Sequence, residues 1–208
     1  LLCYTALARK ALHHKNYDQA ITLLQQLDKY PENLGEGKLY GAQENDIHYL
    51  LGCAYEGLGK ETEANNYFLK ATIGISEPVQ AIYYNDPQPD KIVYQALAWR
   101  KLGNESQARH IFEQFISFGT QHMNDDIKID YFAVSLPDML VFDIDINQRN
   151  RIHCTYLQAL GYLGLGNEAR ATALLNEILQ TDRNHQGAAT HLQMSSFFTT
   201  SKTSAFTL

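Results

Sequence analysis

The sequence contains no long apolar run and no excess of basic residues. Its apolar runs are shorter than about 10 residues, whereas a membrane-spanning helix needs roughly 20. The 208 residues include 17 Lys and Arg against 23 Asp and Glu, which gives a formal net charge of -6. Proteins that bind duplex nucleic acids or anionic membranes need a basic face. We therefore expect no nucleic-acid partner and no membrane partner.

Cysteine is scarce, and the three cysteines are widely spaced. Cys3, Cys53 and Cys154 form no Cys-x-x-Cys pair, so the sequence predicts neither a disulfide framework nor a zinc site. Such cysteines are usually small buried residues, which fits a reducing compartment. The chain starts at Leu1 with residues that already read as helix, and we expect it to be a fragment of a longer protein.

Signatures of catalysis and of cofactor binding are also absent. There is no Gly-x-Ser-x-Gly elbow, no Gly-Lys-Ser/Thr phosphate loop and no His-Glu-x-x-His. Gly164-x-Gly166-x-x-Ala169 resembles a dinucleotide fingerprint, but it ends an amphipathic helix instead of following a strand. The eight histidines are dispersed at spacings that do not suit metal ligation. We therefore predict no enzyme activity, no cofactor and no metal.

The stretch Asp143-x-Asp145-x-Asn147 begins like a calcium-binding loop. Such a loop needs a glycine where Gln148 stands and a bidentate Glu where Cys154 stands. We interpret the stretch as extended backbone followed by a helix that Asn147 caps.

What the sequence does contain is a fourfold repeat of small residues. In each repeat two small residues lie twelve positions apart, and aromatic or aliphatic residues accompany them. Antiparallel helices approach to about 8–10 Å only where the crossing side chains are small. The spacing therefore predicts four helical hairpins. The small pairs are Ala8 and Ala20, Gly52 and Ala64, Ala96 and Ala108, and Ala159 and Ala171.

The residues between the paired helices predict tight turns. A glycine at this place can adopt the positive φ that ends a helix, and the first hairpin has Lys15 there instead. An asparagine follows the turn and is a candidate N-cap of the second helix. The turn glycines are Gly59, Gly103 and Gly166, and the candidate caps are Asn16, Asn104 and Asn167.

This pattern resembles the tetratricopeptide repeat, a helical hairpin of about 34 residues. The resemblance covers about 1–34, 45–78, 89–122 and 152–185, and a helix at about 184–198 would cap the end. The resemblance implies an all-α fold. It would be a single domain, a right-handed superhelical solenoid of four repeats plus the capping helix.

Unequal spacing of the repeats predicts insertions. Equivalent small residues lie 44, 44 and 63 positions apart, so the last interval exceeds one repeat by about 29 residues. This insertion, 121–150, is apolar as well as acidic, and an apolar linker must pack against something. We expect a short helix near 125–134, a turn at Ser135–Asp138 and a second apolar segment that is helix or strand. The shorter extra stretches, 31–41 and 76–90, are expected to be loops.

The insertion and its flanks, 83–103 and 147–166, resemble the C-terminal repeat region of a group of large uncharacterised bacterial proteins. In that group a β-rich domain of unknown function precedes the repeats. The resemblance implies a cytoplasmic bacterial protein whose upstream domain lies outside this chain. No activity carries over from it.

Repeat phase predicts a binding surface, because the first helices of stacked hairpins line a concave face. Its mixture of aromatic, aliphatic and Arg residues suits an extended peptide. We predict a non-enzymatic scaffold that binds a peptide or a partner domain there, although each aliphatic residue can instead pack against neighbouring hairpins. The candidate groove residues are Thr5, Arg9, His13, Tyr49, Glu56, Val93, Arg100, Tyr156 and Leu160.

Two other functions stay open. The chain can be an intramolecular spacer or a dimerisation module that supports an upstream, carbohydrate-related domain, if 121–150 fills the groove or docks that domain. An enzyme built around the acidic insertion would need several of its carboxylates to converge in one cleft. Those carboxylates are Asp125, Asp130, Asp138 and Asp143.

Overall fold

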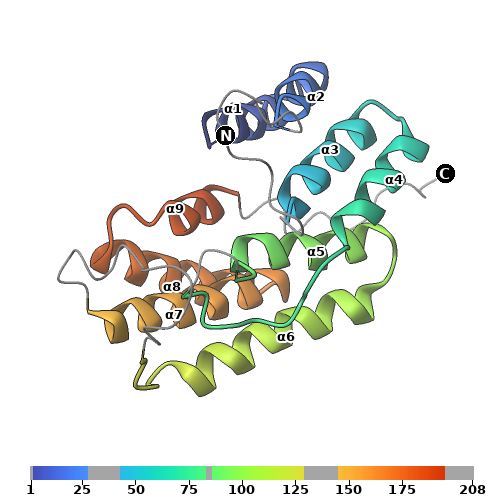
Figure 1. Cartoon of the computed structure of the whole chain (residues 1–208). Coiled ribbons are helices and arrows are strands. Elements are labelled where there is room, and N and C mark those ends of the chain that lie inside the picture. The colour runs from blue at the N-terminus through green and yellow to red at the C-terminus, as the bar shows by residue number, and fades with distance from the viewer. Residues whose placement is uncertain (1, 28–42, 83–85, 129–144, 195–208) are drawn as a thin grey trace, which may run out of the picture. The chain divides into compact units, whose positions relative to one another are not determined.

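The computed structural model of the chain describes residues 2–27, 43–82, 86–128 and 145–194. Within these ranges every regular element is an α-helix (Figure 1), which confirms the predicted all-α class. In the same ranges no helix combines the length and the apolar character that a membrane span requires. The helices are α1 (Leu2–His13), α2 (Tyr17–Gln25), α3 (Asn45–Gly57), α4 (Glu61–Ala71), α5 (Pro89–Lys101), α6 (Glu105–His122), α7 (Ile146–Gly164), α8 (Glu168–Thr181) and α9 (Gln186–Gln193).

The chain divides into two compact units. One unit comprises Leu1–Ile75 and Tyr94–Ala108, and the other comprises Ser76–Val93 and Arg109–Leu208. Helices α5 and α6 each contribute one part to either unit.

The first unit is built from the hairpins α1–α2 and α3–α4, with α2 packed on α3 (Figure 1). Ala8 and Ala20 are fully buried. Gly52 faces the ring of Phe68 so closely that a Cβ would collide with it. The predicted small residues therefore lie where the paired helices cross and allow their close approach.

The turns between paired helices have the predicted conformation. The backbone φ is 73° at Gly59, 83° at Gly103 and 80° at Gly166, and Lys15 adopts the same left-handed conformation at 58°. Of the predicted caps, Asn104 Oδ1 accepts from the Gln107 N–H and Asn167 Oδ1 accepts from the Arg170 N–H, both at 3.2 Å. Asn16 stands at the N-cap of α2, but its side chain makes no capping bond.

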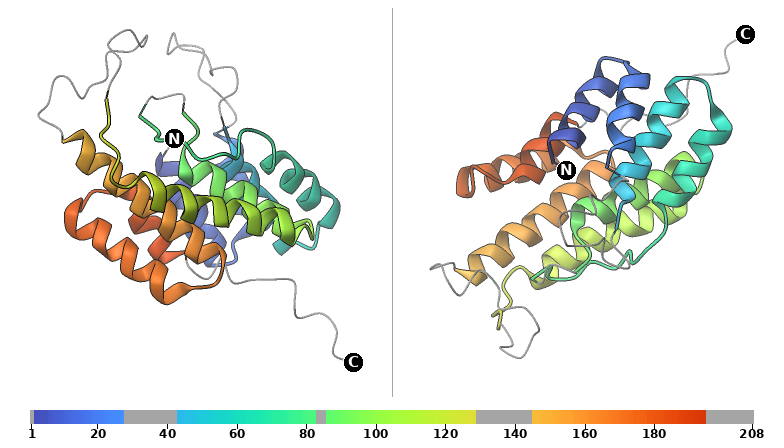
Figure 2. Two further views of the ribbon diagram at one scale, coloured as in Figure 1. Left: turned by 90° about the horizontal axis from the view of Figure 1, so that it is seen from below. Right: turned by 45° about the horizontal axis from the view of Figure 1, so that its top comes forward.

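The second unit contains the hairpin α7–α8, and α9 packs on α8 (Figure 2). Gly161 and Gly164 of α7 lie against the backbone oxygen and the ring of Phe112 in α6, at positions without room for a Cβ. Leu160 and Leu175 of this unit are fully buried. Helix α9 begins near the predicted start of the capping helix and ends within it, and 195–198 lie outside the described residues.

The predicted insertion is shorter at both ends than the spacing indicated. Helix α6 continues to His122, and α7 already begins at Ile146, because Asp145 Oδ1 accepts from the Gln148 N–H at 2.9 Å and caps the helix. The prediction that Asn147 caps this helix was wrong. Asn147 lies inside α7, and its Oδ1 instead accepts from the Ile127 N–H at 2.9 Å.

The expected internal structure of the insertion is mostly outside the described residues. Residues 125–128 are not helical, which contradicts the start of the short helix expected near 125–134. The turn at Ser135–Asp138, the second apolar segment and the expected loop at 31–41 fall in ranges that are not described. In the other expected loop, the described residues 76–82 and 86–88 form no helix.

Candidate binding pocket

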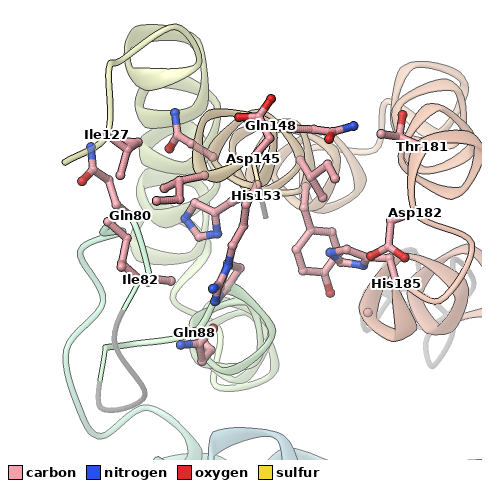
Figure 3. Close-up of a pocket in the computed structure, with 18 of the residues that line it drawn as sticks. Gln80, Ile82, Gln88, Ile127, Asp145, Gln148, His153, Thr181, Asp182 and His185 are labelled. Atoms are coloured by element: carbon pink, nitrogen blue, oxygen red, sulfur yellow. The ribbon is translucent and has the colours of Figure 1, made fainter. Parts of the chain in front are cut away.

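A pocket of about 710 Å³ lies within the second unit (Figure 3). One wall comes from the segment before α5 and the first turn of that helix, and another comes from α7. The connection from α8 to α9 closes a third side. Its lining residues are Gln80, Ala81, Ile82, Gln88, Pro89, Asp90, Ile127, Asp145, Ile146, Gln148, Arg149, Asn150, Ile152, His153, Tyr156, Thr181, Asp182, His185 and Gly187.

Helix α7 contributes a stripe of polar side chains to the pocket. Asp145 at its N-cap is followed by Arg149, His153 and Tyr156, at intervals of four, four and three residues. Positions three and four apart share one face of an α-helix. The helical period of the sequence therefore brings these four side chains to the same cavity.

His153 attaches the segment before α5 to α7. Its Nε2 lies 2.7 Å from the backbone oxygen of Val79, and because a carbonyl only accepts, Nε2 must carry the proton. Burial lowers the pKa of His153, and the bond to Val79 opposes this only in part. The imidazole is therefore neutral near pH 7, and it fixes the wall that carries Gln80 and Ile82.

The connection from α8 to α9 is held by a second histidine. His185 Nδ1 accepts from the Ala188 N–H at 3.0 Å and so caps α9. This bond requires an unprotonated Nδ1. Burial lowers the pKa of His185 and outweighs the opposing effect of Asp182.

Tyr156 closes the pocket between α7 and α9. Its ring meets the ring of His185 edge-on at 4.8 Å between centroids. Its hydroxyl lies 2.8 Å from His191 Nδ1. A Cβ on Gly187 would collide with this hydroxyl, so α9 approaches α7 closely only because residue 187 is glycine.

The residues that flank 129–144 also reach the pocket. Ile127 and Asp145 both line it. Asn147 in α7 accepts from the Ile127 N–H, and Asn150 Nδ2 donates to the His122 backbone oxygen at 2.7 Å. These bonds anchor the end of α6 and the residues after it to α7.

The pocket lining is acidic. Its described residues include three carboxylates, on Asp90, Asp145 and Asp182, against one guanidinium, on Arg149. His153 and His185 add no positive charge near pH 7, because burial lowers the pKa of both. The formal charge of the lining is therefore about -2 at neutral pH.

Among the predicted groove residues, Tyr156 lines this pocket. Several others are part of the core. For the aliphatic positions this is the packing against neighbouring hairpins that the sequence left open. Tyr49 is 1% exposed and Val93 and Leu160 are fully buried, while Thr5 is 9% exposed. Tyr49 packs against the rings of Phe68 and Tyr94.

The charged groove candidates are more accessible, and most make contacts within the first unit. Arg9 Nη2 lies 3.4 Å from the Tyr94 hydroxyl. Glu56 pairs with Lys101 at 2.6 Å, and Arg100 pairs with Glu105 at 2.8 Å. His13 is exposed. That these residues bind a ligand stays a prediction.

Sequence reasoning missed most of the pocket. The sequence presents His153 and His185 as two of eight dispersed histidines, and no motif includes Arg149. The signal that would have found them is the polar stripe on one face of α7, once the helix is extended back to Ile146. Gln80 and Ile82 offered no such signal, because they lie on a loop.

Among the described residues no group of three His, Cys, Asp or Glu side chains is placed to hold a metal ion. Of the carboxylates considered for an acidic active site, Asp125 bonds to His122 and Gln80. Asp130, Asp138 and Asp143 lie outside the described ranges.

Comparison with known families supports the repeat assignment at the start of the chain. The family model of the tetratricopeptide repeat matches residues 2–33, the range that contains α1 and α2. This match supports the first of the repeats, which the sequence placed at about 1–34. No solved structure matches the chain.

Proposed function

We propose that this chain is a non-enzymatic interaction module whose pocket binds a short segment of a partner protein. Tetratricopeptide repeats typically mediate contacts between proteins. The observation that carries the proposal is the place and composition of the pocket. Helices α5 and α7 are the first helices of consecutive hairpins, and both line it. Its mixture of isoleucine, amide and charged side chains suits a peptide.

The exposed and half-exposed groove candidates of the first unit belong to the same proposal. Arg9, His13, Glu56 and Arg100 are polar side chains on or next to first helices, and we propose that they also contact the partner. We further propose that the chain is the repeat region of a larger bacterial cytoplasmic protein with an upstream domain.

The proposal is tested by selecting peptides that bind the full chain from a displayed random library. Gln148 is exposed and lines the pocket, so Gln148→Trp should obstruct the cavity without disturbing the core. We expect the selected peptides to bind this variant at least about tenfold more weakly, measured by fluorescence anisotropy.

The matched control is Asn176→Trp, an equally large change at an exposed position of α8 outside the pocket. It should leave peptide affinity unchanged. Equal binding to wild type and to Gln148→Trp would show that the pocket is not the binding site. Circular dichroism of both variants checks that they fold.

The second candidate function is an intramolecular spacer or a dimerisation module. The observation in its favour is that Ile127, two residues before 129–144, and Asp145, directly after it, both line the pocket. The sequence between them is the apolar part of the predicted insertion. We propose that, in this case, the insertion or an upstream domain uses the surface that a partner segment would otherwise occupy.

Replacing 129–144 by an equally long Gly/Ser segment separates the two functions. If the insertion competes for the pocket, the replacement should strengthen the binding of selected peptides. If it forms a dimer contact, size-exclusion chromatography with light scattering should show a lower mass. Unchanged peptide affinity and unchanged mass would contradict the spacer and dimer functions and leave the partner-binding function.

A further inference from the structure

Two carboxylates of the pocket, on Asp145 and Asp182, each accept one hydrogen bond from a nearby backbone N–H. Asp145 Oδ1 accepts from the Gln148 N–H, and Asp182 Oδ1 accepts from the Asn184 N–H at 2.9 Å. Each of these bonds uses one oxygen. Among the described residues, the second oxygen of Asp145 has only a long contact of 3.7 Å to Arg151, between two exposed side chains, and such a pair contributes little.

Apolar and acidic residues lie on opposite sides of the cavity. Figure 3 shows Ile82 and Ile127, with Gln80 between them, on one side and Asp182 with His185 on the other, while Asp145 lies along the edge between the two sides. A ligand that matches both sides needs an aliphatic group and a positive charge within one short segment.

The helix ends at the pocket do not reverse this charge preference. The N-terminus of a helix carries partial positive charge that acts within its first turn. Asp145 stands at the N-cap of α7 and Asp90 lies in the first turn of α5, so each of these ends has a carboxylate beside it.

From this arrangement we infer that the pocket selects a basic segment of the partner, in which Lys or Arg adjoins an aliphatic residue. The inference rests on the proposed function, because it names the chemistry of the segment that the same pocket binds. Opposite charges speed the encounter, and like charges disfavour the wrong competitors. The arrangement also makes a terminal carboxylate an unsuitable ligand for this pocket.

Three synthetic peptides test the inference on the full chain. They are acetylated and amidated, and their central residues are Leu-Lys-Leu-Lys, Leu-Gln-Leu-Gln or Leu-Glu-Leu-Glu between identical flanks. We expect the Lys peptide to bind at least about tenfold more tightly than the Glu peptide, with the Gln peptide between them. Raising the salt concentration from about 50 to about 500 mM should reduce this difference.

Two charge-removing variants locate the effect in the pocket. In Asp145→Asn and Asp182→Asn the amide oxygen can still accept the hydrogen bond that the carboxylate accepts from the backbone N–H. Both variants should therefore fold. Each should weaken the Lys peptide about three- to tenfold and leave the Gln peptide unchanged. Glu177→Gln removes the same charge at an exposed position of α8 outside the pocket and serves as the control.

Different failures overturn different claims. If the Gln or Glu peptide binds as tightly as the Lys peptide and Gln148→Trp abolishes that binding, partner binding stands and the charge selection is refuted. Lys-peptide affinity that neither Asp variant changes would also refute it. If none of the three peptides binds, the inference fails, and the peptide selection described above decides the proposed function separately.

Discussion

At the scale of single residues, Lys15 is the clearest local conflict in the fold. It occupies the turn position that glycine fills in the other hairpins, and its φ of 58° lies in the left-handed region. This conformation costs a residue with a Cβ roughly 1–2 kcal/mol. The hydrogen bonds from the Lys15 and Asn16 N–H groups to the carbonyl oxygens of Leu12 and Ala11 hold the turn in place.

Lys15→Gly should therefore stabilise the chain. We expect the free energy of unfolding to rise by about 0.5–1 kcal/mol, since part of the relieved strain is offset by the greater backbone entropy of an unfolded glycine. Urea denaturation followed by circular dichroism measures the change. Lys10→Gly, inside α1, is the control and should lower stability by about 1 kcal/mol. A loss of stability in Lys15→Gly would show that the turn is not strained.

At the scale of elements, α9 depends on a titratable cap. His185 caps the helix through an unprotonated Nδ1, and burial lowers its pKa below the usual 6.5. Burial lowers the pKa of His153 in the same unit as well. Below pH 6.5 the unfolded chain therefore binds more protons at these histidines than the folded chain does.

Stability should accordingly fall as the pH drops below about 6.5. The contribution of these histidines is fully present above that pH, declines as the pH passes through their lowered folded-state pKa values, and levels off below them. His185→Asn keeps a capping oxygen that does not titrate. We expect this variant to lose less stability than wild type between about pH 7 and pH 5 in urea titrations. An identical loss in both proteins would show that the cap does not respond to pH.

The elements also show why boundaries were harder to predict than the hairpins themselves. Small residues twelve apart identified the crossings of α1 with α2 and of α3 with α4, because close helix contact demands small side chains at fixed phase. The start of α7 was misplaced because both Asp145 and Asn147 are good capping residues. Which of the two residues caps α7 depends on the Ile127 N–H, which lies 20 positions earlier in the chain and donates to Asn147.

At the scale of the whole molecule, the division into two units could not be read from the repeats. The repeat pattern treats every hairpin alike, whereas the boundary between the units passes through α5 and α6. The pocket likewise needed tertiary structure. Its walls come from residues more than sixty positions apart, such as Gln80 and His153, and the bond from His153 to the Val79 backbone oxygen joins these two segments.

The sequence by itself determined the helical class, the first repeat expected at about 1–34, the turn conformations and two of the helix caps, Asn104 and Asn167. These features depend on local periodicity and on backbone preferences of individual residues, which a sequence displays directly. Only the tertiary structure decided which predicted groove residues are buried and which loop forms a wall of the pocket. It also showed that three carboxylates and two neutral histidines share one cavity. Burial and proximity arise when distant segments pack together, so the charge that a ligand would meet follows from the fold.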